Sequence, residues 1–154
     1  MSNSIQFILG KGGVGKTTVS ILLAKYHASL GQRTLLVECN GSQDIPHHFS
    51  KSSTGYSIVE LEKNIDAISL TAQEAIEDYV LQHLRHRSLY QLIFKNQLIE
   101  PLLDGAPGLH NAVHLGKIYD LACAIEHGKN KYDQIIVDCP ATGHGLQLIS
   151  AAQT

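Results

Sequence analysis

The sequence carries no excess of basic charge and few cysteines. It has 12 Lys and Arg residues against 14 Asp and Glu residues, a formal net charge of -2. Proteins that bind nucleic acid neutralise phosphates with surplus basic side chains, so this balance argues against a nucleic-acid partner. The three cysteines, Cys39, Cys123 and Cys139, form no C-x-x-C pair that would bind zinc or exchange as a dithiol. They indicate a reducing compartment.

Long apolar runs, internal repeats and low-complexity segments are also missing. With 44% apolar and 17% charged residues, the composition is typical of a soluble globular protein and not of a disordered chain or a membrane span. The N-terminal apolar run stops at Gly10 without a basic segment before it, which predicts a cytoplasmic protein without a secretory leader. A length of 154 residues predicts one domain over residues 1–154.

Short apolar runs alternate with longer amphipathic segments, which predicts an α/β fold. Strands are expected at residues 5–9, 34–38, 65–71 and 134–137, and helices at 18–30, 71–84, 88–103 and 115–126. Thr71 and Glu74 form a capping box at the start of the second helix, and Gly128 is expected to end the last one. Residues 40–56 are polar and predict a loop with at most one helical turn. The apolar faces expected to be buried are Val19, Leu22, Leu23, Tyr26 and Leu30 of the first helix, and Ile118, Leu121, Ala122 and Ile125 of the last.

One motif carries chemistry. Residues 10–17 read GKGGVGKT, which satisfies G-x-x-x-x-G-K-[ST] between a predicted strand and a predicted helix. Average composition produces this pattern by chance about once in a few hundred chains of this length. The glycines let backbone N–H groups cradle phosphate oxygens at the N-terminus of the helix. The residues predicted to bind a nucleotide are Gly10, Gly12, Gly13, Val14, Gly15, Lys16, Thr17 and Thr18.

Within this loop, each polar side chain has an expected role. Lys16 is predicted to reach the β- and γ-phosphates, Thr17 to ligate Mg²⁺, and Thr18 to contact the α-phosphate. A P-loop also needs an acid at the end of a neighbouring strand, and Asp138 follows the strand at 134–137. The alternative for Asp138 is a strand-end residue that caps a turn. Together these features predict a P-loop NTPase fold, a doubly wound and mostly parallel sheet of about four strands with helices on both faces, incomplete at one edge.

Two further motifs bring a resemblance to a known family. Lys11 in KGGVGKTT is similar to the extra lysine of deviant Walker A ATPases, and residues 138–144, DCPATGH, resemble the D-x-x-x-T-G-H switch of arsenical pump-driving and tail-anchored-protein-targeting ATPases. The resemblance implies hydrolysis of ATP with Mg²⁺ held by Thr17 and Asp138. It also implies a homodimer in which Lys11 crosses to the partner's nucleotide and acts like an arginine finger. Lys11, Lys16, Asp44 and Asp138 are the catalytic residues that follow from it.

The chain departs from the family pattern after the second predicted strand. The family has an Asp-Pro-Ala segment there, whereas residues 38–44 read ECNGSQD and place Asn40 where an aspartate is expected. Asparagine cannot act as a carboxylate base, so Asp44 or Glu38 is expected to take that role. Full-length members of the family are about twice as long as this chain. It is therefore either the N-terminal portion of a larger ATPase or a reduced member.

Other patterns leave alternatives open. The apolar segment at 89–103 is either buried core or part of a groove for a hydrophobic client, such as a membrane protein, although the chain itself is not expected to span a membrane. The pairs His47–His48 and His83–His86 lack a third ligand at a matching spacing, so no transition-metal site is expected. The first hypothesis is an ATP-hydrolysing switch, and the second is a targeting or regulatory module with little turnover. A kinase is a third hypothesis, for which the sequence shows no acceptor site.

Overall fold

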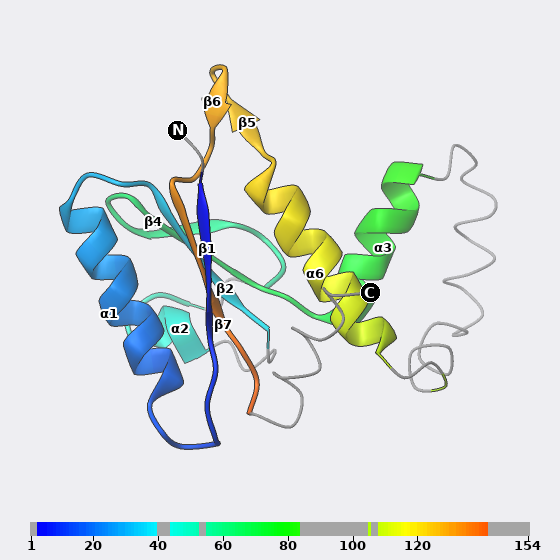
Figure 1. Ribbon diagram of the computed structural model, residues 1–154, viewed down its shortest axis with the longest axis horizontal. Helices are drawn as coiled ribbons and strands as arrows, with labels where there is room; N and C mark the ends of the chain where they lie inside the picture. Colours follow the sequence, from blue (N-terminus) through cyan, green and yellow to red (C-terminus); the bar gives the residue numbers. More distant parts are fainter. Residues whose placement is uncertain (1–2, 40–43, 53–54, 84–104, 106–107, 142–154) are drawn as a thin grey trace.

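A five-stranded sheet organises the protein in the computed structural model, which describes residues 3–39, 44–52, 55–83, 105 and 108–141 (Figure 1). Its strand order is β1-β7-β2-β4-β3. The strands are β1 (Ser4–Ile8), β2 (Thr34–Glu38), β3 (Val59–Glu62), β4 (Ile65–Ser69) and β7 (Gln134–Asp138). The pairs β1–β7, β2–β7 and β2–β4 are parallel, and only β3 runs antiparallel to its neighbour. The predicted α/β fold with a mostly parallel sheet is confirmed.

Helices cover both faces of the sheet (Figure 1). Helix α1 (Lys16–Ser29) packs on one face, where Ile21 and Ala24 contact Leu36 and Ile136 in a buried cluster. Helix α6 (Leu109–Ala122) covers the other face and is paired with α3 (Ala72–His83). The four-residue helix α2 (Asp44–His47) lies in the segment predicted to be a loop with at most one helical turn.

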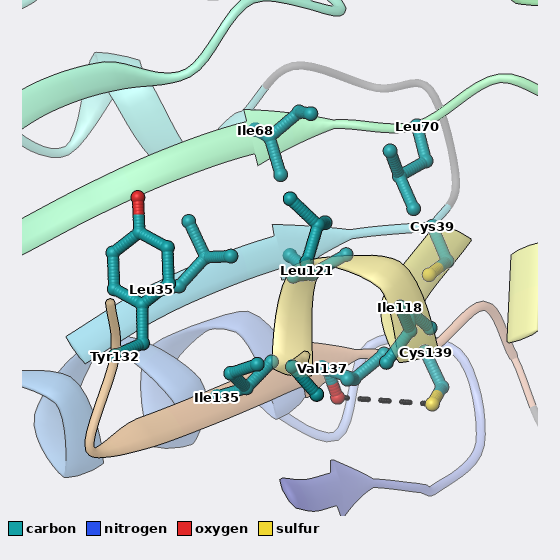
Figure 2. Close-up of a cluster of buried hydrophobic side chains, with 12 residues drawn as sticks. Leu35, Cys39, Ile68, Leu70, Ile118, Leu121, Tyr132, Ile135, Val137 and Cys139 are labelled. Atoms are coloured by element: carbon teal, nitrogen blue, oxygen red, sulfur yellow. Dashed lines mark hydrogen bonds between the residues drawn. The ribbon is translucent and has the colours of Figure 1, made fainter. Parts of the chain in front are cut away.

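The larger core cluster lies between the sheet and α6. Figure 2 shows Ile118 and Leu121 of α6 over alternate residues of three strands, with Cys39 and Cys139 at one end of the cluster. Successive strand residues point to opposite faces, so odd-numbered residues of β2 and β7 enter this cluster and even-numbered ones face α1. The central strands are buried on both faces, as expected for parallel strands under two helical layers.

Most of the residues predicted to form the buried face of α1 are exposed. Val19, Leu22, Tyr26 and Leu30 are exposed, and only Leu23 packs against the core. The helix instead presents Ser20, Ile21 and Ala24 to the sheet. Small side chains bring the helix close to β7, and a hydrogen bond from Ser20 to Asp138 fixes its rotation. The helix therefore faces the sheet with its smaller side chains and leaves its larger apolar side chains exposed.

The last predicted helix is displaced along the chain. It begins at Leu109 and ends at Ala122, where 115–126 was predicted. Gly108, with φ 86°, adopts the left-handed conformation before the helix, which favours glycine. Gly128 does not end a helix: it forms the turn of a hairpin between β5 (Ile125–Glu126) and β6 (Lys129–Asn130).

The hairpin turn explains the error at Ile125. His127 and Gly128 both have positive φ, 51° and 76°, which is the twist that two-residue hairpins require. Ile125, predicted to be buried, is 64% exposed in this hairpin. Arg33 anchors the hairpin to the sheet through an ion pair with Glu126.

Strand β3 is absent from the prediction, which expected about four strands. Its sequence, VELE, alternates polar with apolar residues at the antiparallel edge of the sheet and buries only Leu61. The predicted cap at Thr71 is confirmed: the Glu74 amide donates to Thr71 Oγ1, and the Thr71 hydroxyl lies 2.6 Å from a Glu74 carboxylate oxygen. The helix predicted at 88–103 and residues 142–144 of the predicted switch at 138–144 lie outside the described residues. Among those that are described, no helix is long and apolar enough to cross a membrane.

Candidate nucleotide-binding site

The predicted P-loop connects the end of β1 to the start of α1, at the carboxyl edge of the sheet. Gly13 and Gly15 have φ of 75° and 89°, a conformation that other residues rarely adopt. A Cβ on Gly10 would lie 2.9 Å from a methyl carbon of Val14, so a larger residue there would force the Val14 side chain to shift. The loop thus has the backbone that the motif predicts, with Gly15 capping the N-terminus of a 14-residue helix.

The side chain of Lys16 lies back across this loop. Its ammonium donates a hydrogen bond of 3.2 Å to the backbone carbonyl of Lys11. Lysine carries three donors on a flexible stem, so this contact leaves donors for a second acceptor. Lys11 itself is exposed, as are Gly12, Gly13, Val14 and Thr18. An exposed loop rich in amide donors, with a lysine folded over it, is suited to bind an anion.

Asp138 ends β7 beneath the first turn of α1. Its carboxylate accepts hydrogen bonds from two hydroxyls of α1, Thr17 at 2.6 Å and Ser20 at 3.2 Å, and the residue is 1% exposed. The structure therefore brings Lys16, Thr17 and Asp138, predicted from separate parts of the sequence, to one place. Ser20 was missed because a serine in a helix usually indicates only solvent exposure or a backbone contact.

The donor set suits magnesium. Hydroxyl and carboxylate oxygens are hard ligands, and Mg²⁺ in phosphate sites keeps several waters while binding few protein groups. Thr17 Oγ1 and Asp138 Oδ2 are adjacent at the end of the phosphate loop. These residues fit the cation that a P-loop implies. Among the described residues, no group of three His, Cys, Asp or Glu side chains is placed to hold a metal without a phosphate ligand.

Asp44, the predicted catalytic acid, has an exposed side chain at the start of α2. Its backbone amide donates a 3.0 Å hydrogen bond to Glu38 Oε1. Glu38 is 1% exposed, and its Cα is paired in register with that of Asp138 on the neighbouring strand. Of the two acids predicted to replace the family's aspartate, Glu38 is thus the one buried beside Asp138. Asn40 lies outside the described residues.

The two buried cysteines lie on the α6 side of the same edge (Figure 2). Burial is the main cause that raises the pKa of Cys139 to about 11, and the nearby Asp138 raises it further. Burial also raises the pKa of Cys39, with Cys139, Asp138 and Glu38 adding to the effect. Both side chains are therefore neutral thiols at physiological pH, and they pack as small apolar residues.

Comparison with known proteins decides between P-loop families. A sequence profile of the anion-transporting ATPases matches residues 3–154. The chain belongs to the anion-transporting ATPase family. This confirms the resemblance drawn from Lys11 and the segment at 138–144, and it supports nucleotide binding and ATPase activity at the level of the family.

Individual relatives agree with the family match. It is 29% identical to ATPase BagA of Mycobacterium tuberculosis over 147 residues, which cover 90% of this chain and 43% of the relative. It is 30% identical to ATPase ASNA1 homolog 2 of Paramecium tetraurelia, covering 94% of this chain and 42% of that protein. ATPase asna-1 of Caenorhabditis elegans is 26% identical, with 93% and 43% covered. The chain spans less than half the length of these relatives.

Proposed function

We propose that this chain binds MgATP at residues 10–18 and hydrolyses it as a dimeric molecular switch. The observation that supports the proposal best is the hydrogen bond of 2.6 Å between Thr17 and Asp138, which joins the phosphate loop to the strand that carries the second acid. A glycine-rich turn without a function would not need a buried carboxylate at that position. Family membership supports ATP over other nucleotides.

In the proposed reaction, this chain's residues bind and orient the nucleotide. The amides of residues 12–16 and the ammonium of Lys16 hold the phosphates, after Lys16 exchanges its contact with the Lys11 carbonyl for phosphate oxygens. Thr17 and Asp138 would hold Mg²⁺, with a hydroxyl and a carboxylate that lie side by side. Bound there, Mg²⁺ supplies charge neutralisation at the terminal phosphates. Asp44 or Glu38 orients the attacking water.

Lys11 is the residue on which the proposed dimer depends. It is exposed in the loop, so its ammonium is accessible to a second molecule. In the dimer, Lys11 of each protomer contacts the nucleotide of the other and stabilises the charge that develops on the transferred phosphate. A monomer is then a slow ATPase. The switch acts in the cytoplasm on a hydrophobic client, such as a membrane protein, without crossing the membrane itself.

Single-turnover hydrolysis tests the proposal. With protein in excess over radiolabelled MgATP, phosphate release is expected to speed up with protein concentration, because the active species is a dimer. Lys11→Ala is expected to slow release by about 10³-fold or more while leaving ATP bound, on the scale of an arginine finger. Lys25→Ala, a change at an exposed lysine of α1 that pairs with Glu62, serves as the matched control.

The outcomes separate the two functions. Hydrolysis that depends on protein concentration and on Lys11 supports the dimeric ATPase. Tight binding with no phosphate release over hours contradicts it and supports a targeting or regulatory module that uses the nucleotide only to change shape. The absence of nucleotide binding contradicts both.

A further inference from the structure

Three polar side chains lie in a row at the carboxyl edge of the sheet. Glu38 on β2 is paired in register with Asp138 on β7 and with Ser69 on β4. Side chains at paired positions of parallel strands point to the same face of the sheet. Asp138 faces α1, because it accepts hydrogen bonds from Thr17 and Ser20. Glu38 and Ser69 therefore face α1 too, on the side of the phosphate loop.

All three residues of this row are buried. Asp138 and Glu38 are each 1% exposed and Ser69 is 2% exposed. Within the part of the chain that the structure describes, the Ser69 hydroxyl has no hydrogen-bond partner. Two carboxylates on neighbouring strands repel one another, and burial adds a desolvation cost. A core packed only for stability would place apolar side chains at these positions. Two residues earlier on the same face of the same strands, Leu36 and Ile136 are such side chains. The row therefore indicates a site for a cation and its waters.

Glu38 also contacts the segment that follows β2. Its Oε1 accepts the 3.0 Å hydrogen bond from the Asp44 amide at the first residue of α2. In the family pattern, that segment supplies the aspartate missing at position 40. Glu38 thus lies beside Asp138 and contacts the first residue of α2, whereas the Asp44 carboxylate is exposed.

We propose that Glu38 is a positioning residue that takes over the role of the absent aspartate, by accepting hydrogen bonds from the waters around Mg²⁺. The inference rests on the proposed function, because it concerns the same nucleotide site. Mg²⁺ dehydrates reluctantly, so a carboxylate that binds its waters need not reach the ion. Asp138 and Glu38 then hold the shell from adjacent strands, and Ser69 supplies a hydroxyl beside them.

The magnesium dependence of nucleotide affinity tests this role without measuring turnover. Binding of ADP and of a non-hydrolysable ATP analogue is titrated in Mg²⁺ and in EDTA, for the wild-type chain and for Glu38→Gln. Glutamine still accepts a hydrogen bond from the Asp44 amide, so that contact is retained. Affinity in EDTA is expected to be unchanged. The gain in affinity that Mg²⁺ provides is expected to fall by about 10- to 100-fold, the effect of one charge-assisted hydrogen bond.

Two further variants separate positioning from a structural effect. Glu60→Gln, at an exposed glutamate on β3, is the matched control. It is expected to keep the full increase in nucleotide affinity that Mg²⁺ provides. Adding Asn40→Asp to Glu38→Gln restores the family's aspartate and is expected to recover most of the gain. A merely structural role for Glu38 would not be rescued by that change. Should Glu38→Gln fail to fold, Glu38→Asp shortens the side chain by one methylene and is expected to lower the gain as well.

The results distinguish this inference from the proposed function. If the wild type binds nucleotide and Glu38→Gln keeps its full magnesium gain, or Asn40→Asp restores nothing, the role of Glu38 is overturned and the proposed function stands. The same holds if Glu38→Asp is the variant measured and its gain is undiminished. If the wild type binds no nucleotide in either condition, the proposed function fails, and the inference fails with it.

Discussion

The Thr17 hydroxyl donates a hydrogen bond of 2.6 Å to the Asp138 carboxylate, and these residues are 121 positions apart in the chain. The contact joins the first turn of α1 to the end of β7 and so fixes the phosphate loop on the sheet. Its donor and acceptor are also the two groups proposed to hold magnesium. One hydrogen bond therefore contributes both to folding and to the site, and its removal has two measurable effects.

Thr17→Val removes the hydroxyl at nearly constant volume. Because Asp138 then keeps only the Ser20 donor among the contacts described, we expect the free energy of unfolding to fall by about 1–3 kcal/mol. The magnesium gain in nucleotide affinity should fall as well. Denaturant titration and nucleotide binding measure the two effects. Thr18→Val, at the exposed neighbouring position, should change the unfolding free energy by less than about 0.5 kcal/mol.

Stability should depend on pH through His114. Burial, with a smaller contribution from His110, lowers the pKa of His114 to about 4 from the ordinary 6.5. The folded protein therefore favours the neutral imidazole, and the unfolded chain takes up the proton first as pH falls. The contribution of His114 to the free energy of unfolding is fully present above about pH 6.5 and is lost as pH falls toward 4. The loss is up to about 3 kcal/mol, from about 1.4 kcal/mol for each pKa unit.

Denaturant titrations between pH 7.5 and 4 check this effect. His114→Gln should flatten the curve of unfolding free energy against pH in that range. His47→Gln, at an exposed histidine of α2, should leave the wild-type slope in place. An equally steep slope in the His114→Gln variant would show that other groups cause the pH dependence.

The sequence predicted those parts of the fold in which local chemistry and tertiary packing agree. The strand at 34–38 is confirmed at both ends because a continuous apolar run suits a strand buried on both faces. The loop at 10–17 has the expected backbone because only glycine adopts the conformations at 13 and 15 without strain. The structure brings together Lys16, Thr17 and Asp138 because the carboxyl ends of the parallel strands β1 and β7 lie at the same edge of the sheet.

The errors occur where contacts from distant parts of the chain decide the outcome. The buried face of α1 carries Ser20, Ile21 and Ala24, and the contact of Ser20 with Asp138 on a distant strand cannot be read from the helix sequence. Glycine as a helix stop was a reasonable prediction at 128, but His127 beside it also takes a positive φ, and the pair forms a hairpin turn. Strand β3 is short and polar, and its pairing with β4 determines its conformation more than its own residues do.

The capping box of α3 offers a local test of helix stability. Thr71→Ala removes the hydroxyl that contacts Glu74 and accepts the Glu74 amide, and is expected to cost about 0.5–2 kcal/mol of unfolding free energy. Thr71→Ser retains the hydroxyl and should stay close to the wild type. Thermal and denaturant unfolding compare the three chains. Equal losses in Ala and Ser variants would mean that the methyl group, and not the cap, stabilises this end of α3.

Equilibrium binding of MgATP to the wild-type chain and to Lys16→Ala tests the central claim most directly. Lys16 supplies a charge-assisted contact to the phosphates, and its loss is expected to cost about 2–5 kcal/mol, roughly thirtyfold to several thousandfold in affinity. Lys25→Ala, on the same helix, should bind as the wild type does. The account predicts tight binding by the wild type and a loss confined to Lys16→Ala. Equal affinity in all three chains, or no binding by any of them, would contradict it.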